Sequence, residues 1–174
     1  MVAPRKLRAG RLDTWDFRQA VGSFTTGVTV VTTCGPTGKL EGVTANSFST
    51  VSLDPPLVLW SLGRRSASFE SFHYAKHFVV NVLSVGQMGV SRHFATPRLD
   101  KLEGIAHSRG VGGCPILDDT IAHFECETDQ VMEGGDHAIF LGRVLHASFR
   151  DGEPLVFAKG AYHRATPLVE EVQS

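Results

Sequence analysis

The sequence predicts a mainly β fold, an antiparallel barrel of about seven strands with short helices at its periphery. Runs of β-branched and apolar residues recur along the chain, and most follow one another without an intervening helix. Two long strand-like runs, 121–132 and 137–150, are joined across Gly134-Gly135, which is a strong hairpin signal. Strands joined by tight turns are antiparallel, so a barrel is favoured over a doubly wound parallel sheet.

The first third of the chain predicts one helix and two strands. A short helix is expected over 13–21, because Asp13 can cap it and its apolar residues include i, i+4 neighbours. The β-branched run 27–33 predicts a strand. Gly-Pro-Thr-Gly at 35–38 predicts a turn, and strand-like character resumes over 40–50.

The middle third predicts buried strands separated by helices. Asp54-Pro55-Pro56 predicts an extended link with few hydrogen-bond donors. The continuous apolar runs at 57–62 and 77–83 predict buried strands. Between them, 66–74 predicts a helix that serines open.

The remaining elements follow from caps and glycines. Ser84 with Gln87 forms a capping-box pattern for a helix that runs to about Phe94. The Gly-rich segment 100–115 predicts loop with short pieces. After the long hairpin, 155–157 and the segment around Tyr162 are expected to complete the sheet.

Length and charge exclude several classes of protein. A chain of 174 residues fits one domain, which we expect to span 1–174, with a core over about 15–164 and tails at 1–12 and 165–174. A net charge of −1 argues against a nucleic-acid partner. No apolar run reaches the roughly 18 residues of a membrane span, so we expect no membrane association. The basic N-terminus lacks the apolar region of a secretory signal.

The cysteines, the absent motifs and the histidine spacing limit the kinds of site that we expect in this chain. Three cysteines without a C-x-x-C pair predict reduced thiols in a cytoplasmic protein: Cys34, Cys114 and Cys126. The P-loop, Rossmann, zincin and nucleophile-elbow motifs are absent. The eight histidines show no tight ligand spacing, so we expect no metal site.

The stretch Thr44–Val58 gathers small hydroxyl and amide side chains before a Pro-Pro link. Short side chains let a flat ligand approach the backbone, and hydroxyls with the Asn46 amide supply donors and acceptors. This pattern suits a heteroaromatic ring. It also suits an edge strand that only binds water, and the residues alone do not separate the two interpretations.

Two further clusters carry charge. In Ser61–Phe69, Arg64 and Arg65 precede serines that open a helix, which suits a phosphate but also ordinary capping beside solvated arginines. Ser91-Arg92-His93-Phe94 adds a second cation, or simply ends a helix. In Gly134-Gly135-Asp136-His137 the histidine begins a strand, where it leans over a barrel mouth or lies on the surface.

These clusters, together with Phe17–Gly22 and Gly27–Thr33, resemble the flavin reductase family that has the FMN-binding split barrel. More narrowly, the chain resembles the small NAD(P)H:flavin oxidoreductase components of two-component flavin-dependent monooxygenases. The resemblance covers about 15–162. It implies a Greek-key split β-barrel of about six to seven strands with flanking short helices, working as a homodimer.

The resemblance also implies the ligands and the site. FMN or FAD would be bound, and NADH or NADPH would supply the hydride. Residues 44–47 would face the ring and ribityl parts, three serines would lie near the phosphate, and His137 would lie where the nicotinamide approaches. The implied flavin-binding residues are Thr44, Ala45, Asn46, Ser47, Ser61, Ser66, Ser68, Asn81, Arg92, His93, Phe94 and Tyr162.

The implied reaction is hydride transfer from nicotinamide C4 to flavin N5, after which free reduced flavin reaches a separate oxygenase. Two alternatives stay open: a flavoprotein that retains FMN and reduces a bound substrate, and a non-catalytic flavin- or haem-binding split barrel. The sequence does not choose between NADH and NADPH. The candidate partners of a 2′-phosphate are Arg64, Arg65, Arg92 and Arg143.

Overall fold

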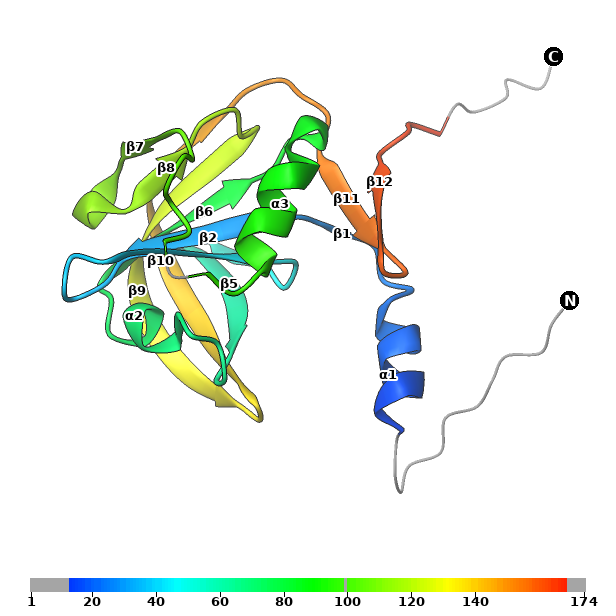
Figure 1. The fold of residues 1–174 in the computed structure, drawn as a ribbon, viewed down its shortest axis with the longest axis horizontal. Helices are drawn as coiled ribbons and strands as arrows, with labels where there is room; N and C mark the ends of the chain where they lie inside the picture. Colours follow the sequence, from blue (N-terminus) through cyan, green and yellow to red (C-terminus); the bar gives the residue numbers. More distant parts are fainter. Residues whose placement is uncertain (1–12, 99, 169–174) are drawn as a thin grey trace, which may run out of the picture.

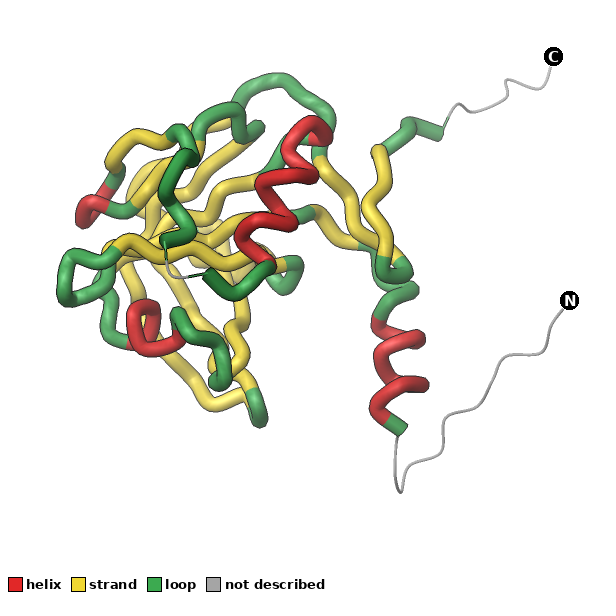
Figure 2. Tube along the Cα trace, in the orientation of Figure 1, coloured by secondary structure: helices red, strands yellow, loops and turns green. Residues whose placement is uncertain are grey.

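The chain folds into a curled antiparallel sheet with a smaller sheet beside it (Figures 1 and 2). The computed structural model describes residues 13–98 and 100–168. The tail expected at 1–12 lies outside the described residues, and the tail expected at 165–174 is described only as far as 168.

The large sheet has seven strands in the order β3-β2-β6-β9-β10-β5-β4, and each neighbouring pair is antiparallel. Its two edge strands, β3 and β4, follow each other in the sequence, so the sheet curls back toward its own beginning. The expected antiparallel barrel is therefore confirmed. The strands are β2 (Thr29–Cys34), β3 (Leu40–Ala45), β4 (Ser49–Leu53), β5 (Pro56–Gly63), β6 (His77–Val82), β9 (Ala122–Gly134) and β10 (His137–Phe149).

The core of the barrel is aromatic. Alternate residues of β5 point inward, and this places Trp60 at the centre with no exposed surface. The Trp60 ring stacks on Phe140 of β10 at a centroid distance of 4.7 Å and meets the edge of Phe72 at 5.0 Å. Such rings bury large apolar areas and interlock, which fixes the register of β5 against β10.

The last strands do not join the large sheet, contrary to expectation. They form a three-stranded sheet with the start of the chain, in the order β1-β11-β12. A tight turn with positive φ at Lys159 (49°) and Gly160 (78°) reverses the chain between β11 and β12. Because β11 pairs with β1 at one edge and with β12 at the other, neither of its edges is left to extend the barrel. The strands are β1 (Thr26–Gly27), β11 (Leu155–Ala158) and β12 (Ala161–Arg164).

The first helix stands beside this small sheet, away from the barrel (Figure 1). Helix α1 (Thr14–Val21) begins as predicted, because the Asp13 carboxylate accepts a hydrogen bond from the Trp15 amide at 3.0 Å. None of its residues is buried. Its apolar side chains are therefore left facing solvent within this chain.

Two other helices lie on the barrel. The predicted capping box is confirmed, since the Ser84 amide donates to Gln87 Oε1 at 3.0 Å, but it opens a 3-10 turn, η1 (Val85–Gln87), ahead of α3 (Met88–Ala95). The helix expected over 66–74 is shorter than predicted. Only α2 (Phe69–His73) is helical, because Ser66 and Ser68 form turns before it.

Two connections also differ from expectation. The strand expected over 40–50 breaks after β3, and residues 46–48 leave the sheet before β4 begins. The expected extended link at Asp54-Pro55-Pro56 is a tight β4–β5 turn with a cis Asp54–Pro55 peptide. The segment 100–115 holds short pieces as predicted, namely β7 (His107–Arg109) and η2 (Val111–Gly113), followed by β8 (Pro115–Leu117).

The β9–β10 hairpin is confirmed. Gly134 pairs with His137 across a two-residue turn, in which Gly135 has a φ of +71°. Among the helices described, none is long and apolar enough to cross a membrane.

Candidate functional site

Hollows that share lining residues form one connected depression, which we call the groove. It joins three hollows of about 690, 210 and 350 Å³. Asn46 and Phe157 line both the first and the second hollow, and Thr44 and Ala95 line both the second and the third. We call these hollows the wide end, the waist and the cationic end. A connected, elongated shape suits a long ligand better than a compact one.

The wide end lies between α1, the 46–49 connection and the β11–β12 turn. Its walls are largely aromatic and aliphatic, with Phe17, Phe24 and Phe157 among them. Thr26 supplies an unusual polar atom here, because its Oγ1 is buried and has no hydrogen-bond partner in the described part of the chain. A buried hydroxyl without a partner is costly, and a bound polar ligand would satisfy it.

The small side chains of residues 44–47 are placed by hydrogen bonds to neighbouring elements. Thr44 Oγ1 donates to the Ser91 carbonyl at 2.6 Å, which ties β3 to α3. Ser47 Oγ accepts from the Ser61 amide at 2.9 Å, which ties the connection to β5. Ala45 is buried in the core. Residues 44, 46 and 47 therefore line the groove, whereas Ser61 holds Ser47 in place through its backbone.

Tyr162 is one of the residues that line the waist. The Tyr162 hydroxyl lies 2.9 Å from Ser91 Oγ, and the Arg92 guanidinium sits 5.7 Å from the centre of the tyrosine ring. Arg92 is thereby held by a cation–π contact of moderate strength. Tyr162, predicted at an entrance, does border the groove.

The cationic end gathers three basic residues and two serines around a hollow, namely Arg65, Arg98, Lys101, Ser66 and Ser68. The Lys101 side chain is buried, with Nζ donating to the Phe94 carbonyl at 3.1 Å. Burial lowers the pKa of Lys101, and the nearby Glu41 carboxylate acts in the opposite direction. No ion pair within the described ranges involves Arg65 or Arg98. This end is suited to an anion.

Some predicted contacts serve the interior instead. Asn81 has no exposed surface; its Nδ2 donates to the Val30 carbonyl and to Thr32 Oγ1, and its Oδ1 accepts from the Leu117 amide. All of its polar atoms are used within the barrel, so the expected contact of Asn81 with a ligand is not retained. The sequence shows that a polar residue lies in a predicted strand, but it does not show that the side chain is bonded inside the barrel.

Three further predicted residues, His93, Phe94 and Ser68, have partners or burial that limit their contact with a ligand. His93 turns its Nε2 to the Lys101 carbonyl at 2.8 Å and so braces the segment that carries Lys101. Phe94 is buried but lines the cationic end. Ser68 lines that end as well, yet its hydroxyl donates to Glu41 and is not free to donate to a ligand.

His137 lies in a separate hollow of about 530 Å³, with Arg64 and Asp136. Its Nδ1 is 2.7 Å from Asp136 Oδ1, and this hydrogen bond lowers the pKa of Asp136. Arg64 is paired with Glu133. The hollow shares Arg65 and Ser66 with the cationic end, so His137 adjoins that end of the groove rather than residues 46–47.

Sequence reasoning missed Thr26 and Lys101. Thr26 stands in a β-branched run like any strand residue, and only its unpaired hydroxyl marks it. Lys101 occurs in a leucine-containing segment whose burial no local pattern shows. The described residues contain no group of three or more His, Cys, Asp or Glu side chains placed to hold a metal ion.

Comparison with known proteins places the chain in a family. The flavin reductase like domain family matches residues 21–166. The FMN reductase (NADH) SmoA of Agrobacterium fabrum is 46% identical over 150 residues, which cover 85% of this chain and 84% of that one. The reductase subunit HsaB of a flavin-dependent monooxygenase from Rhodococcus jostii is 37% identical over 160 residues, covering 91% and 82%.

Solved structures of flavin reductases are also similar to this chain. The NADH:FAD oxidoreductase SgcE6 of Streptomyces globisporus superposes with a TM-score of 0.87 at 37% identity, and 99% of each chain is covered. A second structure of that protein is in complex with NAD and FAD fragments; it has a TM-score of 0.84 at 39% identity and covers 89% of this chain and 94% of that one.

Proposed function

Because the chain belongs to the flavin reductase like domain family, we propose that it reduces FMN or FAD with a nicotinamide nucleotide and passes free reduced flavin to a separate monooxygenase component. It is an NAD(P)H-dependent oxidoreductase. The observation that carries the proposal is the groove, which is apolar at its wide end and positive at the other, within a fold shared with NADH:flavin reductases.

The residues present fit a flavin nucleotide. The wide end offers flat aromatic walls and the unpaired Thr26 hydroxyl, which suit a heteroaromatic ring with polar edges. The cationic end offers Arg65 and Lys101 for a phosphate. Thr44 lies between them and lines both the waist and the cationic end.

When bound, the flavin accepts a hydride from the nicotinamide ring. The protein contributes position and charge. Asn46 and Ser47 would border the ring, and Arg65 and Lys101 would neutralise the phosphate. Tyr162, which Arg92 contacts, lines the waist. Binding both nucleotides against one rigid barrel turns a bimolecular encounter into an oriented one.

His137 is proposed to position the nicotinamide nucleotide through its phosphates. The hollow that contains it is lined by Arg64 and Arg65 and adjoins the cationic end, which supports a phosphate contact more than a contact with the carboxamide. Three of the four arginines considered for a 2′-phosphate are engaged: Arg64 with Glu133, Arg92 over Tyr162, and Arg143 with Asp129.

A homodimer is also part of the proposal. Large apolar side chains are exposed on α1, on the segment after it, on β4 and at the end of β10, namely Trp15, Phe17, Val21, Phe24, Val51, Leu53 and Phe149. Exposed apolar area on this scale supports a contact with another copy. Cys34, Cys114 and Cys126 are free thiols, which supports the expected cytoplasmic location.

The test is a turnover assay that follows the near-ultraviolet absorbance of NADH or NADPH with purified protein and added FMN or FAD. Rapid loss of absorbance that saturates with free flavin is expected. A yellow protein that keeps its flavin and shows no turnover with either nucleotide would contradict the proposal and favour a flavin-binding module.

A further inference from the structure

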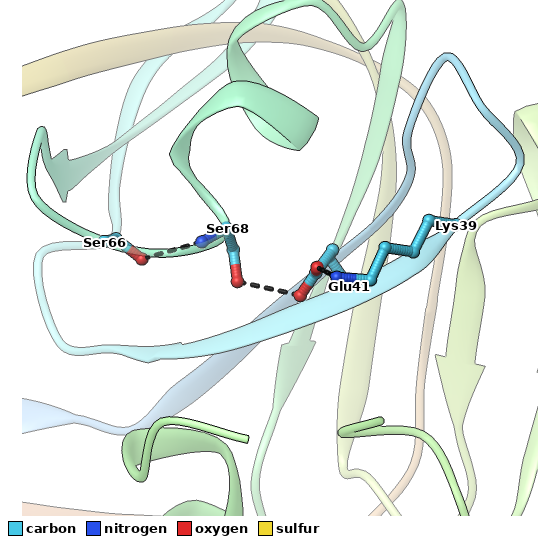
Figure 3. Close-up of polar contacts among 4 residues, drawn as sticks. All are labelled: Lys39, Glu41, Ser66 and Ser68. Carbon is cyan, nitrogen blue, oxygen red and sulfur yellow. Dashed lines mark hydrogen bonds and ion pairs between the residues drawn. The ribbon is translucent and has the colours of Figure 1, made fainter. Parts of the chain in front are cut away.

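A buried carboxylate, Glu41, is bonded to Ser68, one of the residues that line the cationic end of the groove (Figure 3). Glu41 of β3 is only 3% exposed and does not line the hollow itself. One of its oxygens, Oε2, accepts a hydrogen bond from Ser68 Oγ at 2.8 Å. The other, Oε1, lies 2.5 Å from the Lys39 ammonium. Burying a carboxylate is costly, so these partners are needed to hold it there.

The hydrogen bond to Glu41 anchors the turn that forms one wall of the cationic end. Within that turn the Ser66 amide donates to the Gly63 carbonyl, and the Ser68 amide donates to Ser66 Oγ at 3.3 Å. These bonds are all local to the turn. The Ser68 hydroxyl, in contrast, reaches across to a barrel strand, so Glu41 fixes where the turn stands relative to the groove.

The same carboxylate also acts on Lys101, which lines the same hollow. Burial of Lys101 disfavours its charged form, and the charge of Glu41 favours it. Ser66 Oγ accepts a hydrogen bond from the Ser68 amide within the turn, so its own proton is left to donate to an anion. Glu41 therefore supports both the Ser66–Ser68 turn and Lys101, which line the hollow, although Glu41 itself does not line it.

From this arrangement we infer that Glu41 is a positioning residue that sets the affinity for flavins bearing a phosphate, through Ser68 and Lys101. The inference rests on the proposed function, because it assumes that the cationic end receives the flavin phosphate. It goes further by giving a role to a buried acid that faces away from the ligand. Its signature is selectivity: riboflavin, which lacks the phosphate, does not depend on Glu41.

The experiment measures the dissociation constants of FMN and of riboflavin by quenching of flavin fluorescence. Glu41→Leu removes both contacts, and Ser68→Ala removes only the hydrogen bond. Both variants are expected to bind FMN about tenfold more weakly, since a hydrogen bond to a charged group is lost, while binding riboflavin as the wild type does. Glu41→Gln keeps an acceptor for Ser68 and is expected to bind FMN more tightly than Glu41→Leu.

Thr120→Val is the matched control, because it removes another buried hydroxyl, which donates to the Leu117 carbonyl away from the groove. It is expected to change neither constant. At saturating FMN, the kcat of Glu41→Leu should equal that of the wild type while its KM rises.

Equal weakening of FMN and riboflavin in Glu41→Leu and Ser68→Ala would overturn the inference, and so would unchanged FMN binding in both. These outcomes leave the proposed function standing if the wild type binds and reduces FMN. A wild type that binds neither FMN nor FAD would overturn both. If Glu41→Leu fails to fold, Ser68→Ala and Glu41→Gln decide the matter.

Discussion

The ring of Phe94 lies directly over Gly42, so that a Cβ added to this glycine would stand 2.5 Å from Phe94 Cε1. Phe94 is buried between α3 and β3 and lines the cationic end of the groove. We predict that Gly42→Ala destabilises the fold by about 1–3 kcal/mol, because the ring must move in a packed interior. Urea unfolding would measure the change.

Gly89 provides the comparison for Gly42. It lies in α3, and a Cβ there meets nothing within 4 Å. Gly89→Ala should therefore leave stability unchanged or raise it by up to about 1 kcal/mol. Similar losses in both variants would show that the contact with Phe94 is not the cause.

Replacing His137 by Ala should raise the KM for the nicotinamide nucleotide far more than it weakens flavin binding. The residue lies in a hollow that adjoins the cationic end and is separate from the wide end. Steady-state kinetics with each substrate varied in turn would measure the two effects. Asp136→Asn, which keeps a side chain able to accept from His137, should have a smaller effect. Equal losses for both substrates would argue against this role.

Thr26→Val should weaken flavin binding without lowering stability. The hydroxyl has no partner among the residues described, so its removal costs the folded protein no hydrogen bond. A bound flavin that uses it would lose one, which corresponds to about a three- to tenfold higher dissociation constant. Fluorescence titration and thermal unfolding of the same samples would check both parts. A lower melting temperature with unchanged affinity would place the hydroxyl in the fold instead.

We predict that the fold loses stability at alkaline pH because the buried Cys126 thiol resists ionisation in the folded state. Burial raises the pKa of its thiol from the usual 9.0 to about 12. A group with a raised pKa in the folded state stabilises the fold fully below its unfolded pKa, and this contribution is lost as the pH rises toward the folded value. The unfolding free energy should therefore fall between pH 9 and about 12, by up to about 1.4 kcal/mol per pH unit.

The matched variant for this effect is Cys126→Ala. It is less stable at neutral pH, because it leaves a small cavity, but its stability should fall less steeply above pH 9. Denaturant curves at several pH values would give both slopes. Parallel slopes would show that other groups account for the alkaline loss.

The proposed dimer predicts that charge on the exposed apolar side chains produces monomers. Leu53 is 92% exposed and Phe149 is 88% exposed in the single chain. Leu53→Asp and Phe149→Asp should halve the mass in solution, as measured by light scattering after gel filtration. Tyr74→Asp changes an exposed aromatic residue at the end of α2 and should remain dimeric. A monomeric wild type would contradict the proposal.

The sequence predicted the barrel well because local patterns determine most of it. The capping box at Ser84 and the hairpin at Gly134-Gly135 depend on neighbours in the sequence, and both are confirmed. The pairing of β11 with β1 involves segments from opposite ends of the chain, and no local pattern shows it. This is why the last strands were expected in the wrong sheet.

The site was predicted less completely, for a similar reason. The stretches that the resemblance selected include residues that line the groove, but the direction of a side chain depends on packing. Asn81 and Ser68 both look like ligand contacts in the sequence, yet each is engaged by partners far along the chain, Leu117 for one and Glu41 for the other. Conversely, nothing in the sequence distinguishes Thr26 or Lys101 from ordinary strand and loop residues.

The pairing of Thr26 with Phe157 has a consequence for biosynthesis. Both residues line the wide end of the groove, and so do Lys159 and Gly160 from the turn that follows. A nascent chain still attached to the ribosome lacks this wall until β11 and β12 have emerged from the exit tunnel. The barrel strands from β2 to β10 are all synthesised before that moment. Capture of a flavin at the wide end, as proposed, is therefore tied to the synthesis of residues 155–164, and a product that stops before Leu155 lacks this part of the wall.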